Sequence, residues 1–374
     1  MAGDQPFSVV AQGLAADLAA REASGHPVRV GIIGCGEMGT DLVTQIARMK
    51  GLRVAAIADR SGRNAQEAIR IAGYDADHGA AVDGLPALDR AIKRKAIAIT
   101  DDAHTILRSG LIDVIIDATG RPAAGAELGL ATIREGKHLV MMNVEADVTI
   151  GAYLKREADR AGVVYTIGAG DEPTATMELI NFVTALGYPV VAAGKGKNNP
   201  FNPDAVPDDY REEATRRNMN PRMLVEFVDG SKTMVEMSAI ANATGLTLDI
   251  PGMHGPEATL DTLDKILIPK ADGGILGRKG VVDFTVGKGV APGVFVVAEM
   301  DHPRLRERMH DHRSWAMRAD EARAANAWPV GVLDGGKVIA PIAKGELITR
   351  DKVVLPMETP LMTMRLAQEA MFWG

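Results

Sequence analysis

Cysteine is almost missing from this sequence of 374 residues, which contains a single one, Cys35. One cysteine cannot form a disulfide within the chain, so a disulfide framework is excluded and a reducing compartment is favoured. The first residues also lack the basic, apolar and small-residue order of a secretory signal. We therefore expect a cytoplasmic protein.

Long apolar runs and an excess of basic residues are absent as well. No apolar stretch approaches the roughly 20 residues that a membrane-spanning helix needs, which excludes a membrane role. Lys and Arg total 42 against 49 Asp and Glu, giving a net charge of -7, and no long basic run could track a phosphate backbone. Nucleic acid is therefore not an expected partner.

Apolar residues are plentiful, at 46% of a chain longer than one hydrophobic core usually serves. Strand-like apolar runs alternate with helical patterns from 28–34 to 137–142, after an amphipathic helix predicted at 8–21. Strands that are apolar along their whole length and are separated by helices indicate a parallel sheet covered on both faces. The predicted fold is α/β, with a Rossmann-type doubly wound sheet.

The pattern changes twice further along the chain. Residues 232–245 are predicted to form a helix, and 281–300 two strands joined by a Gly/Pro turn, so a second, α+β domain is expected. Short β-like runs near the end, after a helix predicted at 317–327, indicate a small β-rich unit. The predicted domains are residues 1–170, 171–312 and 313–374.

The stretch GIIGCGEMGTDLV follows the first strand and has the spacing G-x-G-x-x-G at Gly34, Gly36 and Gly39. The first glycine permits a tight turn, the second lets a pyrophosphate approach the backbone, and the third lets the helix pack on the strand. The helix N-terminus attracts the negative charge. Strand, motif and helix together predict a dinucleotide-binding loop, in which Cys35 and Glu37 contribute backbone groups.

An acidic residue is expected about 20 positions after this motif, at the end of the next strand. Asp59 occupies that place and can bind both ribose hydroxyls of NAD, whereas the adjacent Arg60 can hold the 2′-phosphate of NADP. Both cofactors, NADP(H) and NAD(H), remain open. Met38 in the glycine loop is assigned to the same site.

The strand VIIDATG ends in Thr119 and Gly120. Ligands of open parallel sheets lie beyond the carboxyl ends of the strands, so these two residues are predicted to border the nicotinamide half of the cofactor. An ordinary strand-to-helix loop is the alternative.

Three further strand ends carry polar residues. They are Asn143 and Glu145 in MMNVEAD, Asp171 and Glu172 in GAGDEP, and Lys195, Lys197 and Asn198 in AGKGKNNP. Alternate residues of a strand share a face, so the two lysines are expected to point the same way, with Gly194 and Gly196 leaving the other face bare.

Two like charges on one face repel unless anions lie between them, and nearby carboxylates or a bound phosphate would supply those anions. Because strand ends of one sheet converge, a reaction site is predicted there. Two structural alternatives stay open: surface ion pairs for the lysines, and a helix N-cap with a first-turn acid for Asp171 and Glu172.

Several segments together carry a family resemblance: GEMGTDLVTQIARM, GKHLVMMNVEADVTIG, GAGDEP, AGKGKNNP and KGVAPGVFVVAEMDHPRL. They resemble the homoserine dehydrogenase-related oxidoreductases that include the 1-deoxy-D-xylulose 5-phosphate reductoisomerase-like (DXR-like) enzymes. The resemblance covers nearly the whole chain, and PIAKGELIT is similar to the C-terminal SAF-type segment of that family. It implies an NADPH-dependent reductoisomerase of isoprenoid precursor synthesis that acts on a sugar phosphate, and a homodimer.

The resemblance also implies a mechanism, in which a ketose phosphate rearranges to an aldehyde that NADPH then reduces to 2-C-methyl-D-erythritol 4-phosphate. Such chemistry uses cationic groups or a divalent cation (Mg or Mn), and acid and base groups. The residues assigned to it are Lys195 and Lys197 for enolate, alkoxide or phosphate charge, Asn198 and Asn143 in support, and Asp171, Glu172 and Glu145 for proton transfer, with Asp171 and Glu172 as the metal ligands.

Two features depart from the family pattern. Val144 and Glu145 follow Asn143 where homoserine dehydrogenases usually have a lysine soon after, which argues against a plain homoserine dehydrogenase. Between His312 and Arg313 a longer segment is expected from the resemblance, so the C-terminal unit is predicted to be incomplete. The alternatives are a dehydrogenase of a small hydroxy or amino acid, and a nucleotide-binding homologue impaired in catalysis.

Overall fold

The computed structural model describes residues 12–310, apart from 76, 200, 217–219 and 288, and residues 325–373, apart from 329–331, 334, 344 and 345. The chain forms two compact units, Met1–Met300 and Asp301–Gly374. The larger unit combines a parallel sheet with a second, smaller sheet. None of the described helices combines the length and apolar content required to cross a bilayer.

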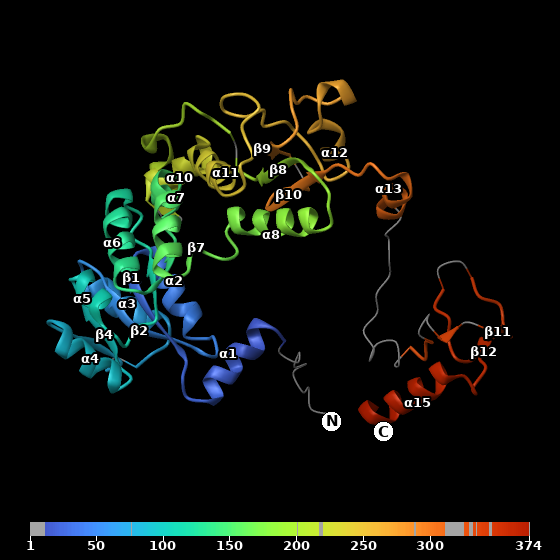
Figure 1. The fold of residues 1–374 in the computed structure, drawn as a ribbon, viewed down its shortest axis with the longest axis horizontal. Coiled ribbons are helices and arrows are strands. Elements are labelled where there is room, and N and C mark those ends of the chain that lie inside the picture. The colour runs from blue at the N-terminus through green and yellow to red at the C-terminus, as the bar shows by residue number, and fades with distance from the viewer. Residues whose placement is uncertain are drawn as a thin grey trace. The chain divides into compact units, whose positions relative to one another are not determined.

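The larger sheet has seven strands in the order β3-β4-β2-β1-β5-β6-β7, all parallel (Figure 1). Its strands are β1 Val28–Ile33, β2 Leu52–Ala58, β3 Gly79–Ala81, β4 Ile97–Thr100, β5 Val114–Asp117, β6 His138–Met141 and β7 Tyr165–Ile167. The order reverses between β1 and β5, where ligands of doubly wound sheets bind. The predicted doubly wound sheet is therefore confirmed.

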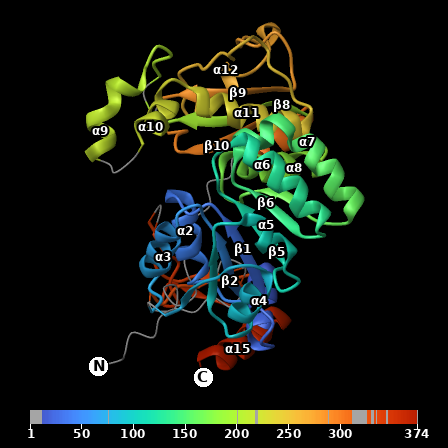
Figure 2. The same ribbon diagram turned by 90° about the vertical axis from the view of Figure 1, so that its left-hand side faces the viewer.

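Helices cover both faces of this sheet. The helices are α1 Leu14–Ala23, α2 Glu37–Ile46, α3 Gly62–Ile71, α4 Leu85–Lys93, α5 Ala103–Arg108, α6 Pro122–Arg134 and α7 Val144–Ala161. Buried residues of α2 and α3 form one core with the strands, and those of α4 to α7 form another. In Figure 2, α2 and α3 lie on one side of β1 and β2, and α5 and α6 on the other. The helix predicted at 8–21 begins at Leu14 within the described residues.

The smaller sheet has three strands in the order β10-β8-β9, formed by β8 Val190–Lys197, β9 Val281–Val286 and β10 Gly293–Ala298. The central strand β8 pairs parallel with β9 and antiparallel with β10. The two strands predicted at 281–300 are confirmed, but they do not pair with one another, because β8 lies between them. The strand of the two lysines also belongs to this sheet, so the expectation that all the polar strand ends share one sheet was wrong.

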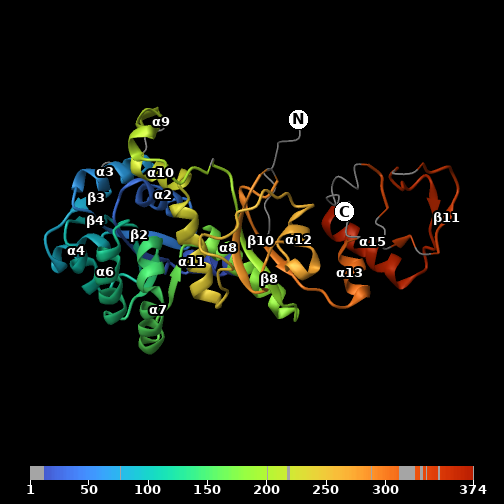
Figure 3. The same ribbon diagram turned by 90° about the horizontal axis from the view of Figure 1, so that it is seen from above.

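The remaining helices of the larger unit flank the smaller sheet. They are α8 Glu172–Ala185, η1 Pro207–Tyr210, α9 Arg211–Arg216, α10 Pro221–Val228, α11 Ser231–Thr244, α12 Leu263–Ile266 and η2 Lys270–Asp272. The helix α11, predicted from its Met and Ala pattern, runs beside α7 in Figure 3. Its Asn242 amide donates to the carbonyl oxygen of Val148 in α7 at 3.3 Å, and its Met237 is fully buried in a core with β8 and β9. This helix thus connects the two sheets.

The face of β8 opposite the lysines is closely packed, so the expectation that Gly194 and Gly196 leave it bare was wrong. A Cβ on Gly194 would lie 1.7 Å from the carbonyl oxygen of Asp283 in β9, and one on Gly196 would lie 2.5 Å from the amide nitrogen of Ala291. Both glycines are needed because the neighbouring backbone approaches closely.

The smaller unit has its own core, formed by Val332, Val353, Leu355 and Met362. Its described elements are α13 Pro303–His310, β11 Lys337–Val338, β12 Val353–Val354 and α15 Pro360–Trp373. The two short strands pair antiparallel, as expected for a small β-rich unit. The segment after His312 and the start of the helix predicted at 317–327 lie outside the described residues.

Substituting Gly194 tests the close packing of β8. We expect Gly194→Ala to lower the free energy of unfolding by about 3 kcal/mol or more, because the Cβ must push β9 away from β8. The control is Gly62→Ala in α3, where no heavy atom lies within 4 Å of the added Cβ. That change should be neutral or stabilise by up to about 1 kcal/mol. Equal stability of the two variants in chemical denaturation would contradict the packing described here.

Candidate active site

The glycine loop after β1 has the backbone geometry that the sequence motif predicts. Gly34 has φ +91°, a left-handed conformation that favours glycine, and Gly36 is the N-cap of α2. A Cβ on Gly39 would lie 2.1 Å from the carbonyl oxygen of Gly34, whereas a Cβ on Gly36 would meet no heavy atom within 4 Å. The loop is therefore closed behind Gly39 and open in front of Gly36, where the first amides of α2 are exposed to a ligand.

A cavity of about 490 Å³ lies in front of this loop. Of the residues assigned to the cofactor, Gly34, Gly36, Asp59, Arg60 and Thr119 line it. The cavity is bordered by the carboxyl ends of β1, β2 and β5, which is the ligand-binding edge of a doubly wound sheet. The other assigned residues, Glu37, Met38, Gly39 and Gly120, adjoin the lining without forming part of it.

The Asp59 carboxylate fixes the shape of the loop. Its Oδ2 accepts a hydrogen bond from the Cys35 amide at 2.7 Å, and its Oδ1 accepts one from the Ser61 amide at 2.8 Å. Oδ1 also accepts a hydrogen bond from Asn64 Nδ2 at 3.4 Å, whereas Oδ2 keeps a second lone pair that can accept a ribose hydroxyl. The Cys35 side chain is buried, and burial raises the pKa of its thiol to about 11, so it is an unreactive thiol.

These observations fit a pyridine dinucleotide. The open space before Gly36 and the amides of α2 suit a pyrophosphate, and Asp59 suits the adenosine ribose. The Arg60 side chain borders the same cavity and can hold a 2′-phosphate.

Asn143 stabilises the loop after β5, whose residues Thr119 and Arg121 line the cavity. Its Nδ2 donates to the Arg121 carbonyl oxygen at 2.9 Å and to the Thr119 hydroxyl at 3.2 Å, and its Oδ1 accepts from the Ala146 amide at 3.3 Å. The residue is 1% exposed and forms the N-cap of α7. These contacts make Asn143 a positioning residue for Thr119, and its predicted catalytic role stays a prediction.

The second part of the site is a cluster of charges around Lys195 in β8. The Lys195 ammonium donates to Glu172 Oε1 at 2.6 Å and also forms a short ion pair with Glu236 of α11. The exposed fractions of the side chains are 10% for Lys195 and 2% for Glu236, but 36% for Glu172. Burial opposes the charge of Lys195, but the two carboxylates outweigh it and raise its pKa. Lys195 is thus a nearly buried lysine that two carboxylates hold in its protonated form.

Asp171 lies beside this ion pair, close enough to Glu172 that a proton on Asp171 would be shared between the two carboxyl groups. Burial first, and then the hydrogen bond with Glu172, raise the pKa of Asp171. Burial acts in the same direction on Glu172, but hydrogen bonds from Asp171 and Lys195 outweigh it and lower its pKa to about 2. Two adjacent carboxyl groups with separated pKa values can serve as an acid and a base.

Asp171 occupies the N-cap position of α8, but its side chain makes no capping hydrogen bond. Glu172 is the acidic residue of the first turn, as the structural alternative expected, and Pro173 follows it. The cap explains where the helix begins. It does not use the Asp171 carboxyl, which remains available to the charge cluster.

Lys197 lies on the same face of β8 as Lys195, as predicted, but it has different partners. Its ammonium donates to the carbonyl oxygen of Phe227 in the last turn of α10 and to that of Asn199 at 3.1 Å. Burial first, and then the charge of Lys195, lower the pKa of Lys197. Cations near a helix C-terminus stabilise it, so these contacts indicate a structural role in this conformation.

Two other assigned residues lie outside the charge cluster. Glu145 is in the first turn of α7, where its charge raises the pKa of Glu226 after the larger effect of burial. Asn198 is exposed at the end of β8, and its Oδ1 accepts a hydrogen bond from Asn199 at 3.2 Å. Their predicted roles in the reaction stay predictions.

Glu236 was missed in the sequence, although a signal was present. It is an acidic residue between Met234 and Met237 in a helix rich in Met and Ala, and it is 1% exposed. A carboxylate at such a position requires a buried cation. Lys232, one turn earlier, lies 3.9 Å from Glu236 but is more exposed than Lys195.

Asp171, Glu172 and Glu236 could also hold a metal ion. One carboxylate oxygen from each lies within 4.8 Å of the others. Carboxylate oxygens are the ligands that Mg²⁺ and Mn²⁺ prefer, so the donor set fits such an ion. Because Lys195 and the shared proton already balance much of the negative charge, a cation must compete with both.

Two family models match this chain, each over one of the two parts of the site. Residues 34–166 match the model of the homoserine dehydrogenase NAD-binding domain, and residues 170–322 match the model of the oxidoreductase DRL catalytic domain. The first match contains the glycine loop and the second contains the charge cluster. The chain is therefore similar to a nicotinamide dinucleotide-binding domain in its first part and to an oxidoreductase catalytic domain in its second.

Among characterised proteins, 117 residues are 29% identical to a homoserine dehydrogenase of Methylobacillus glycogenes, covering 31% of this chain and 25% of that protein. A solved structure of the WlbA dehydrogenase of Bordetella pertussis is 16% identical, with a TM-score of 0.35, covering 50% of this chain and 47% of that one. An NAD-binding oxidoreductase of Klebsiella pneumoniae is 18% identical, with a TM-score of 0.34, covering 48% of this chain and 44% of that one. The chain thus spans about a quarter of the relative and less than half of these structures.

Removing the Asp59 carboxylate tests the cofactor site. We expect Asp59→Ala to weaken NAD binding about tenfold or more, through the loss of hydrogen bonds to the ribose and to the loop. NADP binding should weaken less, because Arg60 can still hold the 2′-phosphate. The matched control is Asp101→Ala, an exposed carboxylate that lines the same cavity without bonding to the loop. Equal losses for NAD and NADP, measured by fluorescence titration, would contradict the assignment.

Proposed function

We propose that this chain is an NADPH-dependent reductoisomerase that converts 1-deoxy-D-xylulose 5-phosphate to 2-C-methyl-D-erythritol 4-phosphate, a step of isoprenoid precursor synthesis. The observation that carries the proposal is the protonated Lys195 held between Glu172 and Glu236, with Asp171 beside them. The C-terminal unit is proposed to be an SAF-type segment. The match of residues 170–322 to the oxidoreductase DRL catalytic domain supports this choice of reaction class.

In this proposal Lys195 stabilises the oxygen that gains negative charge when the carbon skeleton rearranges and when the aldehyde is reduced. Its ammonium is fixed by two carboxylates before the substrate binds, and a preorganised donor costs little reorganisation during the reaction. The bound nicotinamide supplies the hydride. Substrate oxygen can replace Glu172 as a partner of the ammonium, because Glu172 is the more exposed of the two carboxylates.

The carboxyl pair Asp171 and Glu172 is proposed to move the proton between the substrate hydroxyl groups. The rearrangement requires a proton to leave the hydroxyl that becomes the aldehyde and a proton to reach the oxygen of the former ketone, and reduction of the aldehyde then requires one further proton on its oxygen. The pKa of Asp171 is raised, so it keeps a proton to a higher pH than an ordinary aspartate, whereas the pKa of Glu172 beside it is lowered to about 2. A divalent cation held by Asp171, Glu172 and Glu236 would polarise the oxygens of the substrate.

A second candidate is a dehydrogenase of a small hydroxy or amino acid. It is favoured by the ion pairs of Lys195 with Glu172 and Glu236 and the nearby Lys232, which balance the carboxylates without a metal ion. Hydride transfer to a carbonyl needs one proton donor and no rearrangement, so Lys195 alone would suffice.

One assay separates these functions. The proposal expects 1-deoxy-D-xylulose 5-phosphate to cause NADPH oxidation that requires Mg²⁺ or Mn²⁺ and yields 2-C-methyl-D-erythritol 4-phosphate. Oxidation of homoserine with NAD, independent of metal, would support the second candidate. Tight NADPH binding without turnover of either substrate would overturn both and indicate a catalytically impaired homologue.

A pair of lysine variants tests the assignment of the charge cluster. We expect Lys195→Met to lower kcat by about 10²- to 10⁴-fold while the Kd for NADPH stays the same, because Lys195 lies outside the cofactor cavity. Lys197→Met should lower the free energy of unfolding by about 1–3 kcal/mol through its lost carbonyl contacts, and should retain turnover per folded molecule.

The matched control is Lys279→Met, which removes an exposed ion pair with Glu299. It should leave kcat and stability unchanged. Normal turnover of Lys195→Met, or loss of turnover only in Lys197→Met, would contradict the assignment of Lys195.

The pH dependence of Mn²⁺ binding tests the shared proton. Because the pKa of Asp171 is raised, it keeps its proton at a higher pH than an ordinary aspartate, and Mn²⁺ must displace that proton. Affinity should therefore fall as the pH is lowered, and the fall should begin at a higher pH than for a site whose aspartate has an ordinary pKa. Calorimetry in buffers of different ionisation enthalpy should detect proton release. Glu236→Gln should weaken binding at every pH, and binding independent of pH would contradict the shared proton.

A further inference from the structure

A second cavity, of about 640 Å³, lies at the opposite edge of the seven-stranded sheet from the cofactor cavity. Its lining comes from α1, the start of β1, the start of β2, the residue after α4, and the loop before β5. The strand β1 runs from this cavity to the glycine loop. The length of that strand separates the second cavity from the cofactor cavity by about 20 Å. The second cavity is therefore distinct from the site described above.

The lining is basic although the chain as a whole has a net charge of -7. It contains four permanent cations, Arg21, Arg29, Arg53 and Lys95, against two carboxylates, Glu22 and Asp113. The two acids are already engaged: Glu22 accepts from the Gly51 amide at 3.0 Å, and Asp113 forms a two-point ion pair with Arg29. The cavity therefore carries an uncompensated positive charge.

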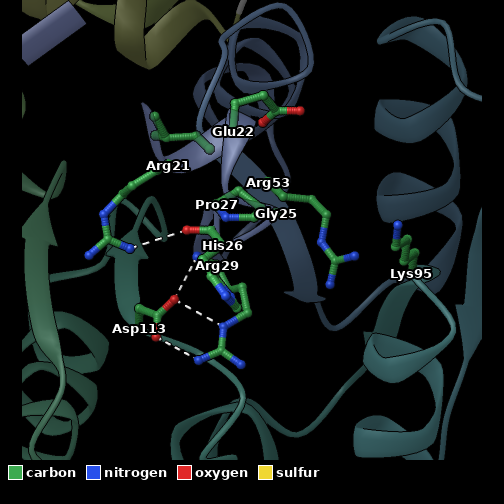
Figure 4. Close-up of a pocket in the computed structure, with 10 residues that line it drawn as sticks. Arg21, Glu22, Gly25, His26, Pro27, Arg29, Arg53, Lys95 and Asp113 are labelled. Carbon is green, nitrogen blue, oxygen red and sulfur yellow. Dashed lines mark hydrogen bonds and ion pairs between the residues drawn. The ribbon is translucent and has the colours of Figure 1, made fainter. Parts of the chain in front are cut away.

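Arg53 and Lys95 carry that charge, and their side chains point into the same space (Figure 4). Arg53 Nη2 donates to the Ile92 carbonyl oxygen at 3.2 Å, but its Nε is buried and has no hydrogen-bond partner among the described residues. Burial first, and then the charge of Arg29, lower the pKa of Arg53. A buried donor without an acceptor destabilises the protein, but this atom has no surface toward the cavity, so a ligand would bind the other nitrogens of the guanidinium.

Lys95 also has no ion pair with any described residue, and its backbone is unusual. Its φ is +64° at the end of α4, a left-handed conformation that glycine adopts without strain. A lysine at this place keeps a long cationic side chain at the rim of the cavity, at a conformational cost that glycine would avoid.

We propose that this cavity is a binding site for the phosphate or diphosphate group of a small molecule, held by Arg53 and Lys95. A planar carboxylate forms a bidentate ion pair with one guanidinium group, and Asp113 already forms such a pair with Arg29. A tetrahedral phosphate accepts hydrogen bonds from several directions, as Arg53 and Lys95 offer from separate elements. The cavity volume lies in the usual range for small-ligand sites.

The test is calorimetric titration of the full chain with inorganic diphosphate while saturating NADPH occupies the cofactor site. We expect one equivalent to bind, and the variant Arg53→Gln/Lys95→Gln to bind at least about tenfold more weakly. The control Arg90→Gln/Lys93→Gln removes the same charge from exposed positions of α4 outside the cavity, and should bind like the unmodified chain. Lys95→Gln alone changes only an exposed side chain, so its weaker binding supports the site even if the double variant fails to fold.

Three results would overturn the proposal: no binding to the unmodified chain, equal binding to all variants, or an equal loss in the control. Citrate is the second probe, and binding as tight as that of diphosphate would overturn the assignment to phosphate. Because NADPH fills the cofactor cavity throughout, these outcomes are independent of the catalytic proposal.

Discussion

The contact between the Lys195 ammonium and the carboxylates of Glu172 and Glu236 ties together three elements of the larger unit. Lys195 belongs to β8, the central strand of the smaller sheet. Glu172 is the first residue of α8, which follows the last strand of the larger sheet after a short segment, and Glu236 lies on α11. Removing one partner of a buried ion pair costs about 3–5 kcal/mol, because an uncompensated charge remains. The same charges therefore stabilise the packing around the smaller sheet and provide the groups proposed to react.

This contact also lies close in the chain to the end of the larger sheet. The larger sheet ends at β7, and only the short segment 168–171 separates it from Glu172. The charge cluster consequently follows the carboxyl edge of the sheet that also presents the glycine loop and Asp59. The helix α11 packs on α7 and so connects the two sheets. It also contributes Glu236 to the charge cluster.

Local patterns in the sequence were sufficient to predict the glycine loop after β1 and the position of Asp59 beside it. The glycine spacing, the strand before it and Asp59 lie within about one βαβ unit, and each depends on backbone geometry that neighbouring residues determine. The same holds for the alternation that places Lys195 and Lys197 on one face. The seven-stranded sheet was predictable for this reason as well.

Contacts between distant residues were not predictable in this way. Glu236 is 41 residues from Lys195, and only the folded chain brings the two together. The sequence could not show that Lys197 caps α10, or that β8 separates β9 from β10, because both depend on which elements pack side by side. Gly194 and Gly196 were expected to face open space, but the backbone of neighbouring segments approaches both of them closely.

The most direct measurement is a crystal structure of the chain with NADPH and a non-reactive phosphonate mimic of the ketose phosphate. If Lys195 performs the proposed chemistry, its ammonium should lie within hydrogen-bond distance, about 3 Å, of an oxygen at the reacting carbons. Glu236 should remain its partner in the complex. A mimic bound elsewhere, with Lys195 still enclosed by Glu172 and Glu236, would contradict the account.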